Sequence, residues 1–166
     1  VVGPAGAQRR VLFGDYMGGV SSEQRAYAEV EDSKTAVDVI EEFLAAYNEE
    51  KPPMHLVMFM DAVEHVSRIS RIIRQPQGNA LLLGVGGSGR QSLTKLATYM
   101  AEYALFQIEI TKNYSTQDWR DDLKRMLLNA GLNEEATVFL FTDTQILQES
   151  FLEDVNNILN SVRFLR

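Results

Sequence analysis

The sequence predicts an α/β protein in which buried strands alternate with helices around a mainly parallel sheet. Three observations predict this class. Short apolar runs of strand length recur at 79–83, 105–110 and 137–141. Segments with apolar residues at helical spacing lie between these runs. A glycine-rich turn stands directly between the first run and the helix that follows it, at the end of a strand where such sheets bind ligands.

The composition is that of one folded domain. The chain has 166 residues, of which 45% are hydrophobic and 23% are charged, and these are ordinary values for a globular protein. The absence of cysteine excludes disulfides, thiol catalysis and cysteine-ligated zinc. The formal net charge of −7 argues against nucleic acid as a partner. No apolar run reaches the roughly 18 residues of a transmembrane helix, so we expect no membrane partner.

The first half of the chain predicts two helices. Asp32 and Ser33 can cap a helix from about 34 to 48, whose apolar stripe is expected to be buried. That stripe comprises Val37, Ile40, Leu44 and Tyr47. Pro52 and Pro53 end it, and a second helix is predicted from about 54 to 74. Its stripe comprises Leu56, Phe59, Val63, Val66, Ile69 and Ile73, and its arginines, Arg68, Arg71 and Arg74, are expected to face solvent.

The second half repeats the strand and helix alternation. A helix follows the glycine turn, with Leu93, Leu96, Ala97 and Met100 on one side. After the strand at 105–110, a helix capped near Thr116 is predicted to reach Ala130, with Trp119, Leu123 and Leu127 inside. A last helix, from about 148 to 160, follows the strand at 137–141. Its expected inward residues are Phe151, Leu152, Val155, Ile158 and Leu159.

The glycine turn predicts a site for an anion. Glycines let the backbone turn tightly and point successive N–H groups inward, and the amino end of the next helix adds partial positive charge. The predicted phosphate-binding residues are Gly84, Gly86, Gly87, Ser88, Gly89, Arg90, Gln91 and Ser92. A tight turn without a ligand, as in a purely structural segment, is the alternative.

Two kinds of phosphate site compete at this turn. Gly84, Gly86 and Gly89 match the G-x-G-x-x-G of dinucleotide-binding folds, and Glu109 stands where a ribose-binding acid is expected. That pattern would indicate an oxidoreductase that uses NAD or NADP. The spacing of Gly84 and Gly89 also matches the mononucleotide P-loop, G-x-x-x-x-G-K-[ST].

The P-loop pattern is altered at two positions. Arg90 replaces the lysine and would bring a forked positive charge to the β- and γ-phosphates. Gln91 replaces the hydroxyl residue, and its amide oxygen is a possible but weaker ligand for Mg²⁺. Asp143 decides in favour of the P-loop, because it ends the buried run at 137–141 as the Mg²⁺-binding carboxylate of P-loop NTPases does. The alternative for Asp143 is a turn or capping acid.

These residues resemble a known family. The run 84–93, preceded by the segment 65–76, is similar to the fourth AAA+ module of an axonemal dynein heavy chain. The segments 119–124, 139–146 and 149–160 strengthen the resemblance, which covers about 11 to 161. It implies a P-loop NTPase (AAA+) fold, a three-layer parallel sheet flanked by helices. In domain terms it implies a loose segment at 1–10, a leading loop and helices at 11–78, and a truncated P-loop core at 79–161. We expect the small helical lid to be absent and the end at 162–166 to be atypical.

The resemblance also implies a function. The parent protein would be a minus-end-directed microtubule motor that drives cilia and flagella, with six AAA+ modules in one ring. The fourth module would be regulatory and would bind ATP or ADP with Mg²⁺. Its partners would be the neighbouring AAA+ modules and, through the parent protein, intermediate chains, light chains and microtubules. The expected location is the cytoskeleton of the cytoplasm, in the axoneme of a cilium or flagellum.

Little hydrolysis is expected at this site, and no catalytic residue is predicted. In AAA+ ATPases the residue after the Mg²⁺-binding acid is a glutamate that positions the attacking water, whereas this chain has Thr144. The alternative is that Gln145, or an acid from outside the chain, takes that role.

Overall fold

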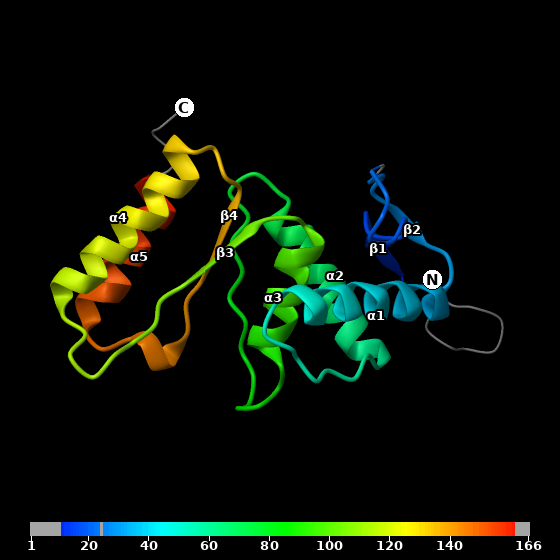
Figure 1. Ribbon diagram of the computed structural model, residues 1–166, viewed down its shortest axis with the longest axis horizontal. Helices are drawn as coiled ribbons and strands as arrows, with labels where there is room; N and C mark the ends of the chain where they lie inside the picture. Colours follow the sequence, from blue (N-terminus) through cyan, green and yellow to red (C-terminus); the bar gives the residue numbers. More distant parts are fainter. Residues whose placement is uncertain (1–10, 24, 162–166) are drawn as a thin grey trace. The chain divides into compact units, whose positions relative to one another are not determined.

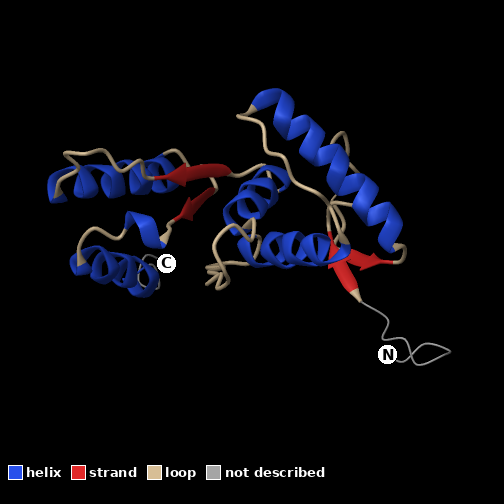
Figure 2. Cartoon of the chain, turned by 90° about the horizontal axis from the view of Figure 1, so that it is seen from below, coloured by secondary structure: helices blue, strands red, loops and turns tan. Residues whose placement is uncertain are grey.

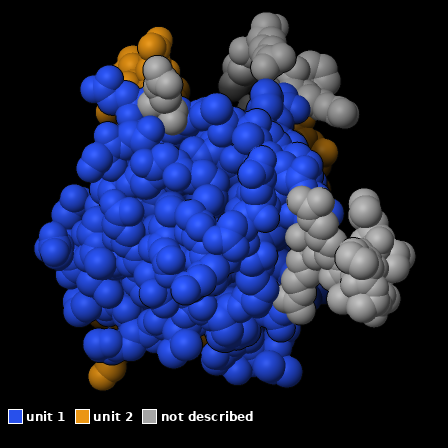
Figure 3. Space-filling view, turned by 90° about the vertical axis from the view of Figure 1, so that its right-hand side faces the viewer, with its two compact units in different colours: residues 1–104 blue, residues 105–166 orange. Residues whose placement is uncertain are grey.

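The computed structural model describes residues 11–23 and 25–161, and these form two compact units, 1–104 and 105–166 (Figure 3). The predicted loose segment at 1–10 and the atypical end at 162–166 lie outside the described residues. The units are helices with short strands (Figure 2), so the predicted α/β class is confirmed. None of the described helices has both the length and the apolar character needed to cross a membrane. The boundary predicted at residue 78 stays a prediction.

Unit 1 contains a small antiparallel sheet, whose first strand packs against helix α2 (Met60–Ile73), and three helices (Figure 1). Strand β1, Leu12–Gly14, pairs with β2, Ala28–Val30, so that Leu12 faces Val30 and both are buried. Neither β1 nor β2 was predicted from the sequence.

Helix α1, Ser33–Glu50, forms as predicted. The Asp32 carboxylate accepts hydrogen bonds from the N–H groups of Lys34 and Thr35, at 3.1 Å each. This is the N-cap that the sequence indicates. The Thr35 hydroxyl also donates to this carboxylate, at 2.6 Å. That hydrogen bond first, and then the two from the N–H groups, hold the pKa of Asp32 below its ordinary value.

Helix α2 is shorter than predicted, because it runs only from Met60 to Ile73. The six residues before it are extended, and Met54 is tied to the end of α1 by Asn48, which accepts from the Met54 N–H at 2.7 Å. In this segment burial alternates residue by residue, with Met58 buried and Val57 and Phe59 exposed. That is the period of a strand rather than of a helix, so the assignment of Leu56 and Phe59 to a helical stripe was wrong.

The predicted strand at 79–83 is also wrong as secondary structure. These residues are extended, but the described part of the chain pairs no strand with them. Leu81 and Leu83 are 83% and 82% exposed, and Leu82 alone of the three packs against the core of unit 1. An apolar run becomes a buried strand only where neighbours cover it, and the described residues of unit 1 supply a neighbour on one side alone.

Helix α3, Arg90–Met100, lies directly after the glycine turn, as predicted. Leu93, Leu96, Ala97 and Met100 are all buried against the core that α1 and α2 share. Tyr99 makes an edge contact with Tyr47 of α1, with ring centroids 5.4 Å apart. The helix behind the turn is therefore held along its length by tertiary packing.

Unit 2 contains the second half of the alternation. Strand β3, Ala104–Gln107, and strand β4, Thr137–Leu140, pair with each other and are separated in sequence by α4, Thr116–Leu132. This is the predicted β-α-β order. A short 3₁₀ helix, η1, spans Asp143–Gln145, and α5 spans Glu149–Ser161.

The core of unit 2 forms around Trp119. Its ring stacks on Phe151 of α5, with centroids 4.2 Å apart and planes 3° from parallel, and its Nε1 donates to Asp154 at 2.8 Å. On α4 the buried residues after Trp119 are Leu123 and Met126. The predicted Leu127 is exposed instead, because a helix returns to the same face after seven residues more closely than after eight. Leu152 and Leu159 of α5 are also exposed, because they share a face that lies about 100° round the helix from the buried Phe151.

Candidate nucleotide-binding site

The glycine turn of unit 1 has a backbone conformation that favours glycine, and the space over its backbone is open. Gly87 and Gly89 adopt φ values of +77° and +74°, in the left-handed region that glycine tolerates best. A Cβ placed on Gly86 or Gly87 would meet no other atom within 4 Å. The glycines are thus not required by packing inside the described chain. Space is left open directly over the backbone, which fits the approach of an anion such as phosphate.

The amino end of α3 adds the second part of the site. Gly89 is the N-cap residue of this helix, and its carbonyl accepts from the Leu93 N–H at 2.8 Å. The first N–H groups of a helix have no acceptor within the helix, and glycine has no side chain to supply one. A helix start of this kind favours negative charge. The predicted residues from Gly84 to Ser92 therefore form one continuous turn and helix start.

Arg90 differs from the expectation. Its guanidinium donates to the carbonyls of Leu82, at 3.1 Å, and Val85, at 3.2 Å. Instead of pointing over the turn, the side chain closes the turn onto the extended segment before it. Its direct contact with phosphate stays a prediction, because such contact would require Arg90 to release these two carbonyls.

One flank of the turn is formed by the extended segment at 54–59. A Cβ on Gly89 would lie 3.9 Å from Cδ2 of Leu56, which is ordinary van der Waals contact. Leu56 packs in turn against the core cluster of unit 1. The helix start is therefore supported from the side by an apolar residue that sequence reasoning had assigned to a helix.

Asp143 lies three residues after the last residue of β4, Leu140, in unit 2. It is the first residue of η1, its carboxylate is exposed, and Oδ1 accepts from the N–H of Thr144 at 3.0 Å. An exposed carboxylate at this position is chemically suited to bind Mg²⁺ directly or through water. The same hydrogen bond is also what a turn-capping acid makes, so the structure is compatible with both interpretations.

Gln145 has a role that the sequence analysis missed. Its side chain is buried, Oε1 accepts from the Thr142 N–H at 2.7 Å, and Nε2 donates to the carbonyl of Ile108. Both ends of the amide are thus engaged within unit 2, and the alternative that Gln145 positions water is not supported. The T-x-x-Q spacing of a capping box, Thr142 to Gln145, is the sequence signal that could have found this role.

The predicted site residues belong to different units of the chain. The turn at 84–89 belongs to unit 1, whereas Asp143 and Thr144 belong to unit 2. Glu109, the acid of the dinucleotide hypothesis, is exposed just after β3, also in unit 2. Gln91 is exposed in the first turn of α3 and Ser92 is half-buried beside it.

A strand-like segment, a glycine turn and a helix start in this order define a P-loop protein. Residues 54–164 match the family described as the P-loop containing dynein motor region D4, and the chain belongs to this family. The family match confirms the resemblance and the P-loop fold, and it sets aside the dinucleotide-binding interpretation of Gly84, Gly86 and Gly89.

Similar proteins agree with this assignment. Over 152 residues the chain is 54% identical to dynein axonemal heavy chain 1 of Homo sapiens, which covers 91% of the chain. It is 51% identical to dynein axonemal heavy chain 3 of Mus musculus over 92% of the chain, and 48% identical to dynein axonemal heavy chain 2 of Homo sapiens over 93%. The chain spans only about 4% of the length of each of these relatives.

Proposed function

We propose that the chain is a regulatory nucleotide-binding module of an axonemal dynein heavy chain, and that ATP or ADP binds at the turn 84–92. The observation that carries this proposal is the backbone of Gly86, Gly87 and Gly89, open to approach and directly joined to the amino end of a buried helix. Backbone N–H groups in such a turn bind phosphate oxygens without requiring a charged side chain.

The metal belongs to the same proposal. Asp143 would hold Mg²⁺, with Gln91 as a further possible ligand, because exposed carboxylate and amide oxygens are hard ligands of the kind this ion prefers. Mg²⁺ would neutralise phosphate charge when bound. Thr144 follows Asp143 and carries a hydroxyl rather than a carboxylate, so the site is expected to bind nucleotide with little hydrolysis.

The activity of the whole protein is proposed from its relatives. Their names identify axonemal dynein heavy chains, so we propose that this module works within a minus-end-directed microtubule motor in the axoneme of a cilium or flagellum. Its immediate partners would be the neighbouring AAA+ modules of the same heavy chain. Intermediate chains, light chains and microtubules would be partners of the parent protein.

Hydrogen exchange in the full-length protein tests nucleotide binding at this site and separates it from other nucleotide sites. Peptides that cover 84–93 should exchange more slowly with Mg·ADP or Mg·ATP present, and at an unchanged rate with NADH. Exchange at 84–93 that no adenine nucleotide slows would refute the proposal and favour a structural segment without a ligand.

A further inference from the structure

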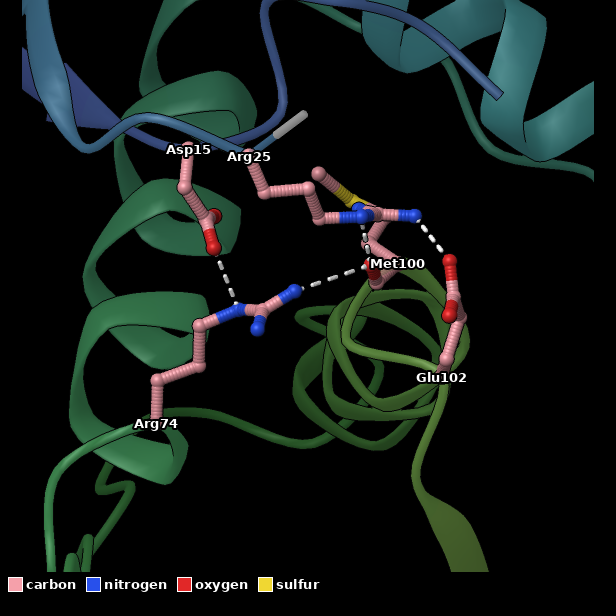
Figure 4. A network of polar contacts seen from close by, with 5 residues as sticks. All are labelled: Asp15, Arg25, Arg74, Met100 and Glu102. Atoms are coloured by element: carbon pink, nitrogen blue, oxygen red, sulfur yellow. Dashed lines mark hydrogen bonds and ion pairs between the residues drawn. The ribbon is translucent and has the colours of Figure 1, made fainter. Parts of the chain in front are cut away.

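We propose that Arg25 and Arg74 are positioning residues for the glycine turn, acting through the opposite end of α3. This inference rests on the proposed function, because it concerns the regulation of the same nucleotide site. The two side chains converge on the backbone carbonyl of Met100, the last residue of α3 (Figure 4). We call Arg25, Arg74 and their acidic partners, Asp15 and Glu102, the arginine clamp.

The clamp joins three parts of unit 1. Arg25 donates from Nη1 to the Met100 carbonyl at 2.7 Å and pairs through Nη2 with the Glu102 carboxylate. Arg74, the C-cap residue of α2, directs Nη2 at the same carbonyl at 3.5 Å. Its Nε lies 2.6 Å from Oδ2 of the buried Asp15. Arg74 was predicted to face solvent, and that prediction is wrong because this buried acid from the segment after β1 pairs with it.

The backbone at the end of α3 leaves one carbonyl for the clamp. Ala97, Thr98 and Tyr99 give their carbonyls to backbone N–H groups, at 3.0, 3.1 and 2.9 Å respectively. The next carbonyl, that of Met100, receives the arginines instead. Cationic donors at the carboxyl end of a helix complement its dipole, and hydrogen bonds from a charged group are stronger than neutral ones.

Glu102 follows the C-cap of α3 and supplies the carboxylate that pairs with Arg25. Its φ of +59° places it in the left-handed position that ends many helices and that glycine occupies at least cost. A glutamate accepts strain at this position, and its carboxylate is the group that pairs with Arg25.

The influence of the clamp on the turn must travel through the helix itself. Eleven residues separate the two ends of α3 by about 16 Å, which is about two Debye lengths at physiological salt. The direct field of the arginines at the turn is therefore small. Because α3 is one continuous helix, a shift of its carboxyl end along the helix axis would carry the N–H groups at its amino end with it. By reciprocity, nucleotide at the turn should strengthen the contacts that Arg25 and Arg74 make with the end of α3.

Hydrogen exchange in the full-length protein, titrated with Mg·ADP, tests this coupling. The variants are Arg25→Ala, Arg25→Lys, Glu102→Gly and, as a matched control, Arg68→Ala, whose exposed arginine pairs only along its own helix with Glu64 in the described contacts. In Arg25→Ala the ADP concentration that half-protects peptide 84–93 should rise about fivefold. In Arg25→Lys, which keeps the positive charge and one donor nitrogen, this ADP concentration should rise less. In Arg68→Ala it should stay unchanged.

The outcomes separate the two proposals. If ADP does not protect peptide 84–93 in the unaltered protein, the nucleotide-binding function itself fails. If ADP protects it equally in the unaltered protein and in Arg25→Ala, the clamp inference is overturned and the function stands. If Arg25→Ala also loses protection in α2, and so has unfolded, Glu102→Gly decides. That variant removes backbone strain together with the carboxylate, so an unchanged ADP midpoint in it overturns the inference, whereas a raised midpoint without lost stability supports it.

Discussion

The buried side-chain amide of Gln145 donates a hydrogen bond to the backbone carbonyl of Ile108, and so connects the residues that follow β4 to those that follow β3. The other end of the amide accepts from the Thr142 N–H. Asp143 and Thr144 lie between Thr142 and Gln145 in the sequence, so one neutral side chain helps to set the position of both candidate site residues within unit 2.

We expect Gln145→Ala to destabilise unit 2 by about 1–3 kcal/mol, because it leaves a buried carbonyl and a backbone N–H without their partner. The measurement is the free energy of local unfolding from hydrogen exchange of α4 and α5 in the full-length protein. Gln148→Ala is the matched control, since Gln148 is exposed and bonds to the Thr116 hydroxyl. Equal, small effects of both changes would show that the Gln145 amide is dispensable.

Gly89→Val is expected to weaken nucleotide binding at the turn by about tenfold or more, which is about 1.4 kcal/mol or more of binding free energy. The Cβ itself would fit, at 3.9 Å from Leu56, but a β-branched residue at φ +74° is strained and crowds the backbone that phosphate must approach. Protection of peptide 84–93 by Mg·ADP measures the effect. Gly131→Ala, a change in α4 with open space around it, is the control, and unchanged protection in Gly89→Val would remove the turn from the site.

Asp143→Ala should remove most of the Mg²⁺-dependence of nucleotide binding and leave the fold intact, because the carboxylate is exposed at a strand end. Asp143→Asn keeps an acceptor for the Thr144 N–H but lacks the charge, so it should resemble the alanine variant if the metal matters. ADP affinity measured with Mg²⁺ and with EDTA gives the comparison. A Mg²⁺-dependence that survives in both variants would leave Asp143 as a capping acid.

The sequence predicted those elements whose signal is local. The cap at Asp32, the turn followed by α3, and the β-α-β order of unit 2 all follow from short-range residue patterns. The extended segment at 54–59 was missed because Leu56 and Phe59, three residues apart, fit a helical period. The residues that turn inward are instead Met54, Leu56 and Met58, which alternate with exposed neighbours. The strand at 79–83 was wrong because its burial depends on neighbours, which a local pattern cannot show.

The candidate site also contains features that have a local sequence signal and features that do not. The positions of the turn and of Asp143 could be predicted, since glycine spacing and a strand-ending acid are sequence patterns. The bonds of Arg90 to Leu82 and Val85 could not be predicted, because they depend on carbonyls that the folded turn itself brings into reach. The pairing of Asp15 with Arg74 joins residues 59 positions apart, by the difference of their numbers, and has no local signal.

Thr144→Glu in the full-length motor, with the other hydrolytic sites silenced, should raise residual ATP turnover. Hydrolysis in this fold needs a group that orients the attacking water, and one preorganised group commonly contributes ~10²–10³ in rate. Thr144 is exposed beside Asp143, so a glutamate fits there without entering the core. The change gives up a local hydrogen bond between the hydroxyls of Thr144 and Thr142, which lie 3.0 Å apart. Gln145 cannot substitute while its amide is committed to Thr142 and Ile108.

Thr144→Gln is the control that isolates the carboxylate, because it has nearly the same size without the negative charge. Turnover that rises with glutamate and not with glutamine would show that the missing base limits hydrolysis. A rise in neither variant would place the limit elsewhere, at Gln91 or at groups outside the chain. If the unaltered site, with the others silenced, already turned over ATP at a rate comparable to the motor's main hydrolytic module, the expectation of little hydrolysis would be wrong.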